Sequence, residues 1–156
     1  MPQIIHFHLF KLKIMATVKK SIIVGVPVEE VYNYLADQKN QPDWIPSMVE
    51  VWDTSEPVVG STFKWKYKMA GVLLEGETTV TELVPNKRLR TVSKGAVASD
   101  WLFLLEARDG KTELELTIEY TIPVPVLGKV AEKIMLKRNE READLAIENI
   151  KVTLES

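Results

Sequence analysis

The chain has 156 residues, of which 46% are hydrophobic and 27% charged, and its formal net charge is −2. A chain of this length forms one domain that buries roughly 70% of the surface its unfolded form exposes. The near balance of acidic and basic residues leaves no electrostatic footprint for nucleic acid, so we expect no nucleic-acid partner. The sequence has no cysteine, which excludes disulfides, thiol catalysis and thiolate metal sites.

The histidines restrict the chemistry further. Both of them, His6 and His8, lie in the first few residues, and none follows. This distribution argues against a Ser-His-Asp triad or a histidine-ligated zinc in the body of the domain. We therefore expect neither a metal nor a cofactor.

The first 14 residues are mostly apolar but too few to span a bilayer, which takes roughly 20 residues. They also lack the layout of a signal peptide. Met15 opens MATVKKSIIVGVP, which resembles a natural start. We interpret residues 1–14 as an N-terminal extension, either mis-assigned or disordered, with an added edge strand as the alternative, and residues 15–156 as one domain. A cytoplasmic location without integral membrane association is expected.

The next segments predict a strand and a helical region. Residues 17–25 are rich in β-branched types and predict a first strand. Pro27 then opens VPVEEVYNYLADQ, which has helical spacing and two glutamates at the positive end of the helix dipole. Trp44 follows between two prolines, in a loop with one short helical turn. A second strand is predicted near residues 48–54.

Residues 61–69, STFKWKYKM, predict the clearest strand, because apolar and basic side chains alternate strictly. Folding this strand onto residues 72–80 sets lysines against glutamates on the outer face and aromatic rings against small partners inside. Alanine suits a type I′ turn poorly, so we favour a four-residue loop around Ala70 and Gly71 with the same register. Beyond Val80 the alternation slips, which predicts a bulge. The predicted pairs are Lys66–Glu75, Lys64–Glu77, Tyr67–Leu74, Trp65–Gly76 and Phe63–Thr78.

A second hairpin and a long helix complete the chain. After a weaker strand near 88–94, Asp109-Gly110 forms a preferred two-residue turn. Folding about this turn places Leu102 and Leu104 on the outer face. Residues 123–156 have no glycine or proline after Gly128 and predict a long C-terminal helix. The predicted inner-face pairs of this hairpin are Leu105–Leu114, Phe103–Leu116 and Trp101–Ile118.

The order of these elements resembles a known superfamily. The stretch SIIVGVPVEEVYNYLADQKNQPDWIPSMVEV, the ending LAIENIKVTLE and the turns VTELVPNKRL and EARDGKTELELTIEY resemble the START-like SRPBCC superfamily, in particular its polyketide cyclase/dehydrase and lipid transport branch. The resemblance covers residues 17–155. It implies an α+β helix-grip fold, in which a curved antiparallel sheet of about seven strands wraps around the C-terminal helix and encloses an apolar cavity. Members bind lipids, polyketides, sterols, quinones or plant metabolites, and a minority catalyse cyclisation or dehydration, so the fold does not decide the function.

The aromatic row on the inner face of the sheet is the main candidate site. It would line a pocket for a flat or apolar ligand, or it would simply fill the core, and the same face can do both. Trp44 would lie at the cavity entrance by the family's layout or act as a loop anchor, which we favour. The predicted ligand-binding residues are Phe63, Trp65, Tyr67, Trp101, Phe103, Tyr120, Ile134, Arg138 and Trp44.

The terminal helix carries two apolar stripes on different sides. Between them, residues 137–142, KRNERE, are almost wholly charged. Arg138 and Glu142 have i, i+4 spacing, so they would either pair inside a partly wet cavity or lie in solvent. Burying an unpaired charge is costly, and we favour the solvated interpretation. The first stripe is Leu127, Val130, Ala131 and Ile134, and the second is Ala143, Ile147, Ile150 and Leu154.

Three functions are compatible with these features. The first is binding or carriage of a small hydrophobic molecule. The second is a cofactor-independent cyclase or dehydratase, which would use Tyr67, Tyr120, Arg138 or Glu142 as donors and acids. The third is a protein-interaction module, with a homodimer across Leu102 and Leu104 as its simplest form.

Overall fold

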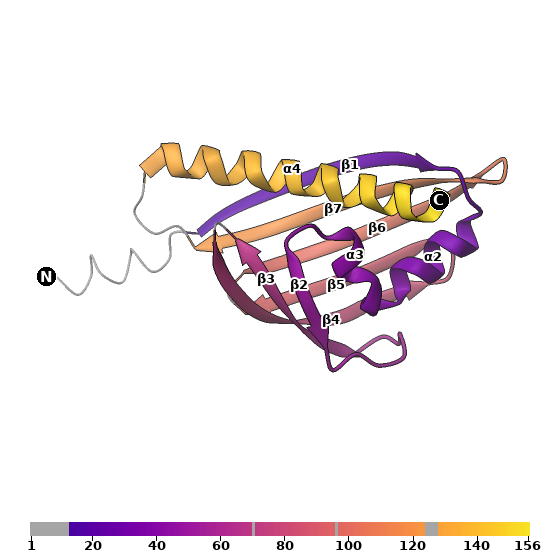
Figure 1. Ribbon diagram of the computed structural model, residues 1–156, viewed down its shortest axis with the longest axis horizontal. Helices are drawn as coiled ribbons and strands as arrows, with labels where there is room; N and C mark the ends of the chain where they lie inside the picture. Colours follow the sequence, from indigo (N-terminus) through magenta and orange to yellow (C-terminus); the bar gives the residue numbers. More distant parts are fainter. Residues whose placement is uncertain (1–12, 70, 96, 124–127) are drawn as a thin grey trace, which may run out of the picture.

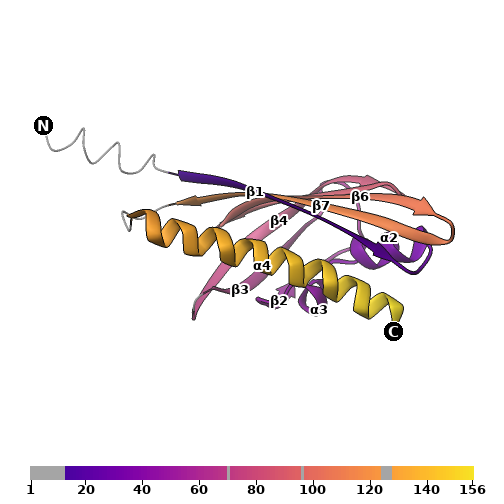
Figure 2. The ribbon, with the colours of Figure 1, turned by 90° about the horizontal axis from the view of Figure 1, so that it is seen from above.

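The computed structural model describes residues 13–69, 71–95, 97–123 and 128–156. Within these ranges it has one curved sheet and helices on one side of it (Figures 1 and 2). Residues 1–12 of the predicted extension lie outside the described residues, whereas Lys13 and Ile14 belong to the first strand. The elements are β1 (Lys13–Val24), α2 (Val28–Ala36), η1 (Gln38–Asn40), α3 (Gln41–Trp44), β2 (Met48–Trp52), β3 (Thr62–Met69), β4 (Val72–Val84), β5 (Arg88–Gly95), β6 (Ala98–Arg108), β7 (Lys111–Pro123) and α4 (Gly128–Glu155).

The seven strands form one antiparallel sheet in the order β1-β7-β6-β5-β4-β3-β2. Helix α4 runs along β1 beneath the sheet, and α2 and α3 lie on the same side (Figure 2). Most of the buried apolar side chains form one cluster between the sheet and these helices. The expected α+β architecture, with about seven strands and a long C-terminal helix, is confirmed.

The β3–β4 hairpin has the predicted register in all five pairs. Its turn is shorter than expected, because Met69 pairs directly with Val72 and leaves two residues between the strands. Gly71 has φ 82°, a left-handed conformation that glycine adopts without strain, and Ala70 lies outside the described residues. The Lys66–Glu75 ion pair forms at 3.9 Å.

The outer-face charges of this hairpin are arranged differently from the prediction at one position. Lys64 stands opposite Glu77 in register, but its ammonium bonds Asp53 at 3.4 Å. Glu77 instead lies 3.9 Å from Lys94 on the neighbouring strand β5. The lysine side chain is long and flexible and can reach carboxylates in several directions, so strand register alone does not determine which carboxylate it pairs with.

The bulge after Val80 and the second hairpin are also confirmed. The β4–β5 register shifts between Val80 and Glu82, which turns Glu82 to the outer face beside Arg88 and Arg90. All three inner-face pairs of the β6–β7 hairpin form as predicted, and the two turn residues have the left-handed φ values that a type I′ turn needs. Leu102 and Leu104 are half-buried on the outer face.

Helix α4 packs on the sheet with the face predicted for its last turns, where Ala143, Ile147 and Ile150 are almost fully buried. The prediction for its first stripe is wrong at Ile134, which is 62% exposed. At about 100° per residue, Ile134 lies on the side of the cylinder opposite Ala143. The side chains of Leu127, Val130 and Ala131 lie outside the described residues.

Gly76 provides a first test of this packing, because the Trp65 ring lies directly over it. A Cβ at Gly76 would overlap that ring and would lie 2.7 Å from the backbone oxygen of Lys94. We expect Gly76→Ala to destabilise the fold by about 1–3 kcal/mol, the usual cost of overpacking, in urea denaturation. Gly25→Ala is the control, since its Cβ would meet atoms no nearer than 3.4 Å, and it should change stability by less than about 0.5 kcal/mol. Equal effects of the two substitutions would show that Trp65 does not need this space.

Candidate ligand-binding pocket

A pocket lies between the inner face of strands β3 to β7 and the segment from α3 to β2. Measured as the space open to the centres of water molecules, its volume is ≈ 70 Å³. One water needs about 10–15 Å³ by this measure, so the pocket has room for more than single waters. All the space between its wall atoms, the open mouth included, is ≈ 600 Å³. The pocket is lined by Gln41, Ile45, Met48, Trp65, Tyr67, Met69, Thr78, Thr91, Ser93, Val97, Ser99, Trp101 and Tyr120.

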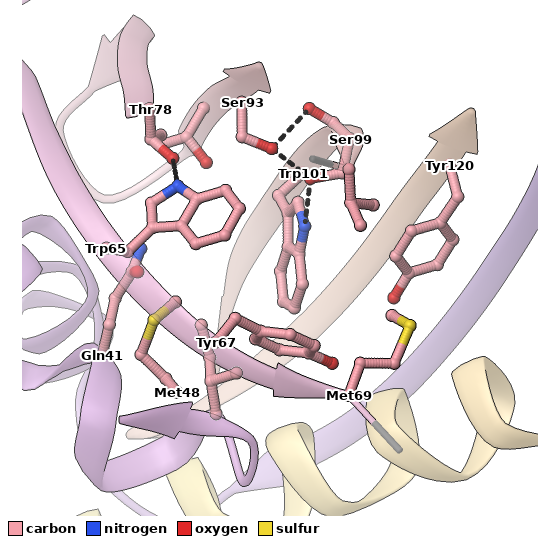
Figure 3. A pocket seen from close by; sticks show the side chains of 13 residues that line it. Gln41, Met48, Trp65, Tyr67, Met69, Thr78, Ser93, Ser99, Trp101 and Tyr120 are labelled. Carbon is pink, nitrogen blue, oxygen red and sulfur yellow. Dashed lines mark hydrogen bonds between the residues drawn. The ribbon is translucent and has the colours of Figure 1, made fainter. Parts of the chain in front are cut away.

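Two tryptophans flank the pocket and are held in place by hydrogen bonds to hydroxyls (Figure 3). The Trp65 indole N–H donates to Thr78 Oγ1 at 2.9 Å, and the Trp101 indole N–H donates to Ser99 Oγ at 3.1 Å. Trp65 also packs edge-on against Tyr67, with the ring centroids 6.4 Å apart. Because both indoles are anchored at one end, their faces have fixed positions in the pocket wall.

Three hydroxyls stand side by side at the top of the pocket, and we call Thr78, Ser93 and Ser99 the hydroxyl row (Figure 3). The row is a product of strand register, because Thr78 pairs with Ser93 across β4 and β5, and Ser93 pairs with Ser99 across β5 and β6. The Ser93 and Ser99 hydroxyls hydrogen-bond each other. Thr78 and Ser93 are only 5% and 8% exposed, and Ser99 is half-buried, so the row is a largely buried polar feature of the pocket wall.

The opposite part of the pocket carries two phenols in front of a carboxylate. Burial raises the pKa of Tyr67 and of Tyr120 well above the usual value, and the negative charge of Glu142 raises both further. Glu142 itself is buried on α4 and accepts a hydrogen bond from the Ser47 backbone N–H at 3.1 Å. Both phenols are therefore neutral at ordinary pH.

The charged middle of α4 is exposed at Lys137, Glu140 and Arg141, as favoured, but differs from the prediction at Glu142. Glu142 is buried instead of solvated, and the hydrogen bond from the Ser47 N–H offsets part of the hydration that its carboxylate loses. Arg138 is half-buried and lies near enough to Tyr67 to lower its pKa slightly against the larger raising effects. Within the described residues Arg138 and Glu142 form no ion pair, so the alternative of a buried pair is wrong as well.

Four of the nine predicted site residues line the pocket, namely Trp65, Tyr67, Trp101 and Tyr120. The other five lie elsewhere. Phe63 is a buried core residue, Arg138 is half-buried on α4, and Ile134 is exposed on the far side of that helix. Phe103 and Trp44 line a second, smaller cavity of ≈ 20 Å³.

Trp44 is a buried anchor of the short helix α3 and not an exposed entrance residue. It is 2% exposed, and its ring packs edge-on against Trp101 and Phe103, with centroids 5.9 and 5.7 Å away. The Asn149 side chain on α4 donates to the Trp44 backbone oxygen at 3.3 Å. These contacts hold the segment that forms one side of the pocket.

The sequence did not predict nine of the residues that line the pocket, and for most of them the sequence pattern gave only a weak indication. The threonine opposite Phe63 was available from the β3–β4 register, and Ser99 stands two residues before Trp101 on the same face. Ser93 required the register of β5, whose pattern is the weakest of the inner strands. The missed residues are Gln41, Ile45, Met48, Met69, Thr78, Thr91, Ser93, Val97 and Ser99.

The described ranges of the chain contain neither a cluster of metal-binding side chains nor a membrane-spanning helix. No group of three histidine, aspartate or glutamate side chains converges there as a metal-binding set. None of the helices described is long and apolar enough to cross a bilayer.

The sequence matches one protein family over nearly its whole length. The profile of the family described as "Polyketide cyclase / dehydrase and lipid transport" matches residues 15–155. The chain belongs to this family. Its sheet, gripping a C-terminal helix, is accordingly the helix-grip fold of START-like proteins.

Individual proteins are similar to this chain over most of its length. An uncharacterized 17.2 kDa protein of Streptomyces lincolnensis is 27% identical over 133 residues, which cover 84% of this chain and 85% of the relative. A START superfamily protein of Mycobacterium smegmatis has a TM-score of 0.74 at 16% identity, covering 89% of this chain and 97% of that protein. A protein of Thermus thermophilus has a TM-score of 0.78 at 15% identity, with the same two coverages. At these identities the two solved structures establish the fold alone.

In this member of the polyketide cyclase/dehydrase and lipid transport family, the two buried tyrosines predict how the stability of the fold depends on pH. A tyrosine in the unfolded chain ionises at a pKa of about 10, whereas Tyr120 in the folded protein holds its proton to higher pH. The stability from this difference is complete below pH 10 and is lost as the pH rises above it. Each such tyrosine should contribute a fall of about 1.4 kcal/mol per pH unit there.

Urea denaturation between about pH 9 and about pH 11 tests this expectation. Tyr120→Phe should show a slope that is smaller by the contribution of one tyrosine. Tyr32→Phe is the matched control, because the smaller burial of Tyr32 raises its pKa less. If Tyr120→Phe and the wild type lose stability in parallel, Tyr120 does not retain its proton in the folded state.

Proposed function

We propose that this protein binds a small, largely apolar molecule in the pocket between its sheet and the α3 segment, and acts as a binding or carrier protein. The observation that supports this most directly is the pocket itself, whose walls combine four aromatic rings, two methionines and two aliphatic side chains with five small or medium-sized polar ones. Lipid transport is part of the family's description, which agrees with such a role.

The size of the pocket sets the scale of the expected affinity. A one-ring or two-ring ligand that buries about 200 Å² of apolar surface gains about 5 kcal/mol from that burial. This free energy corresponds to a Kd on the order of 0.1 mM. The entropy cost of binding weakens this affinity, and specific hydrogen bonds strengthen it. Binding assays should therefore cover micromolar to millimolar concentrations.

A pair of neighbouring substitutions tests the proposal. Thr91 lies on the inner face and lines the pocket, whereas Val92, one residue further along β5, points outward and is 37% exposed. Thr91→Phe should fill the pocket and weaken binding of the neutral two-ring fluorophore Prodan by at least about tenfold, since its ring would take the place of the ligand. Val92→Phe adds the same ring on the outer face and should bind like the wild type.

An organic extract of the purified protein, analysed by mass spectrometry, complements this comparison. The wild type should carry apolar compounds that Thr91→Phe has lost, and circular dichroism should show that both variants are folded. If the wild type does not bind the fluorophore, or if Thr91→Phe and Val92→Phe bind it equally, the pocket is not a binding site.

A cyclase or dehydratase is the second candidate, because the Glu142 carboxylate lies behind Tyr67 in the pocket wall, close enough to raise the pKa of that phenol. Glu142→Gln keeps an acceptor for the Ser47 N–H and removes the base. An enzyme of this kind should convert a poly-β-ketone thioester to a cyclised product, and Glu142→Gln should slow that conversion by about 100-fold or more. Conversion at an unchanged rate in Glu142→Gln counts against the enzyme.

A protein-interaction role has less support. Leu102 and Leu104 are half-buried, and each stands opposite an arginine on the outer face, Arg90 and Arg88 respectively. The homodimer across these leucines stays a prediction, which sedimentation velocity of the wild type and of Leu102→Glu would test.

A further inference from the structure

The hydroxyl row carries more hydrogen-bond donors than its own bonds use. An indole nitrogen only donates, so Trp65 and Trp101 make Thr78 Oγ1 and Ser99 Oγ acceptors. The hydroxyl protons of Thr78 and Ser99 must then point away from the indoles. The two tryptophans thus orient the row as well as flanking the pocket.

Counting protons identifies the unused donors. The row has three hydroxyl protons, and the contact between Ser93 and Ser99 uses one of them. If Ser99 donates in that contact, the Ser93 proton has a weak acceptor in the Ser99 backbone oxygen at 3.4 Å. If Ser93 donates, the Ser99 proton is left over. In either case Thr78 donates to no acceptor within the described residues, and the open space beside it is the pocket.

The charges of the pocket restrict what those donors can bind. Among the described residues that line it, none is charged. Behind the phenols, the Glu142 carboxylate acts on both Tyr67 and Tyr120 and repels anions. The Arg138 guanidinium acts on Tyr67 alone and with the smaller effect. A carboxylate or phosphate placed in this pocket would lose its hydration without contacting a cation in the pocket wall, which is costly. A neutral oxygen has no such penalty.

The acceptors of the pocket lie away from the row. Gln41 comes from α3 and lies below Trp65, on the side opposite the hydroxyls (Figure 3). One of its two amide N–H groups donates to Gln38 Oε1 at 2.8 Å, and its side-chain oxygen accepts no hydrogen bond within the described residues. The neutral phenols of Tyr67 and Tyr120 are further donors in the opposite part of the pocket, so a ligand oxygen meets donors at both places, and the hydroxyl row is the set of donors beside the two indoles.

From this arrangement we infer that the pocket selects a neutral ligand whose apolar body lies between Trp65 and Trp101 and whose carbonyl or ether oxygen accepts a hydrogen bond from the hydroxyl row. The inference rests on the proposed binding function and narrows it to a class: ketones, esters, quinones or ethers, in preference to hydrocarbons of the same shape and to carboxylic acids.

Three probes of nearly equal size test the class. Acetophenone presents a carbonyl, α-methylstyrene replaces that oxygen by a methylene group, and benzoate carries a negative charge. Titrations followed by the four tryptophan indole N–H signals in ¹⁵N-correlated NMR report Kd for each probe. One net hydrogen bond makes acetophenone bind about three- to tenfold more tightly than α-methylstyrene. Benzoate should bind more weakly than both at neutral pH.

Variants of the row assign the preference to its hydroxyls. Thr78→Val and the double variant Ser93→Ala/Ser99→Ala each remove donors, and at least one of them should lower the ratio of the two dissociation constants toward one. Thr78→Ser keeps the hydroxyl and should keep the ratio. Thr79→Val is the matched control, because it removes a hydroxyl from the opposite face of β4. The ratio is measured within each variant, so a general loss of affinity cancels.

The outcomes separate this inference from the function on which it rests. If acetophenone and α-methylstyrene bind equally to the wild type, or if both row variants keep the wild-type ratio, the hydroxyl row does not select the ligand, while the binding function stands. If neither neutral probe binds, the binding function fails and the inference fails with it. Benzoate binding as tightly as acetophenone would also overturn the inference.

Discussion

The register of strands β3 to β6 is the constraint on which the pocket depends. Because side chains alternate along a strand, a slip of one residue would turn every inner-face side chain outward. The observed register sets Trp65 over Gly76 and brings Thr78, Ser93 and Ser99 into one row across three strands. The same register therefore supplies the apolar wall, the space for its largest ring and the hydroxyls that hold that ring.

The helices are held at a set distance from this inner face, so that a pocket remains between them and the sheet. Two side chains of α4 hydrogen-bond the segment from α3 to β2, Glu142 to the Ser47 N–H and Asn149 to the Trp44 oxygen. Both bonds join residues about a hundred positions apart in the chain, so they hold α4 and this segment at a set separation. Trp44 fills the space next to Trp101 and Phe103 with a rigid ring. The pocket is the volume that these fixed parts leave between them.

The two hairpins were predictable from the sequence because their information is local. Strict alternation, one two-residue turn and opposite charges determine a register without reference to the rest of the chain. The fate of Glu142 was not predictable in this way. Its burial depends on an N–H group 95 positions away, and no nearby residue indicates that bond. The prediction for Ile134 was wrong for a related reason. The later turns of α4, which pack on β1, determine which face of the helix is buried, and its first apolar residues do not.

The hydroxyl row lies between these two cases. Each of its residues is an ordinary small polar residue in a strand, and only the combined register of three strands shows that they meet. Ser93 came from the strand with the weakest pattern, so the row could not be assembled before β5 was placed. Polar groups that act together across several strands are for this reason harder to predict than the aromatic row, whose members are conspicuous one at a time.

The same geometry bears on the choice between a binding protein and an enzyme. Glu142 does not line the pocket among the described residues and already accepts the Ser47 N–H. Proton exchange between Glu142 and a ligand would therefore pass through Tyr67. Burial and the charge of Glu142 raise the pKa of that phenol, whereas an efficient general acid has a pKa near the working pH. A phenol that holds its proton so firmly stays neutral and can donate a hydrogen bond to a ligand, but it is a poor acid, which favours binding over proton transfer at this site.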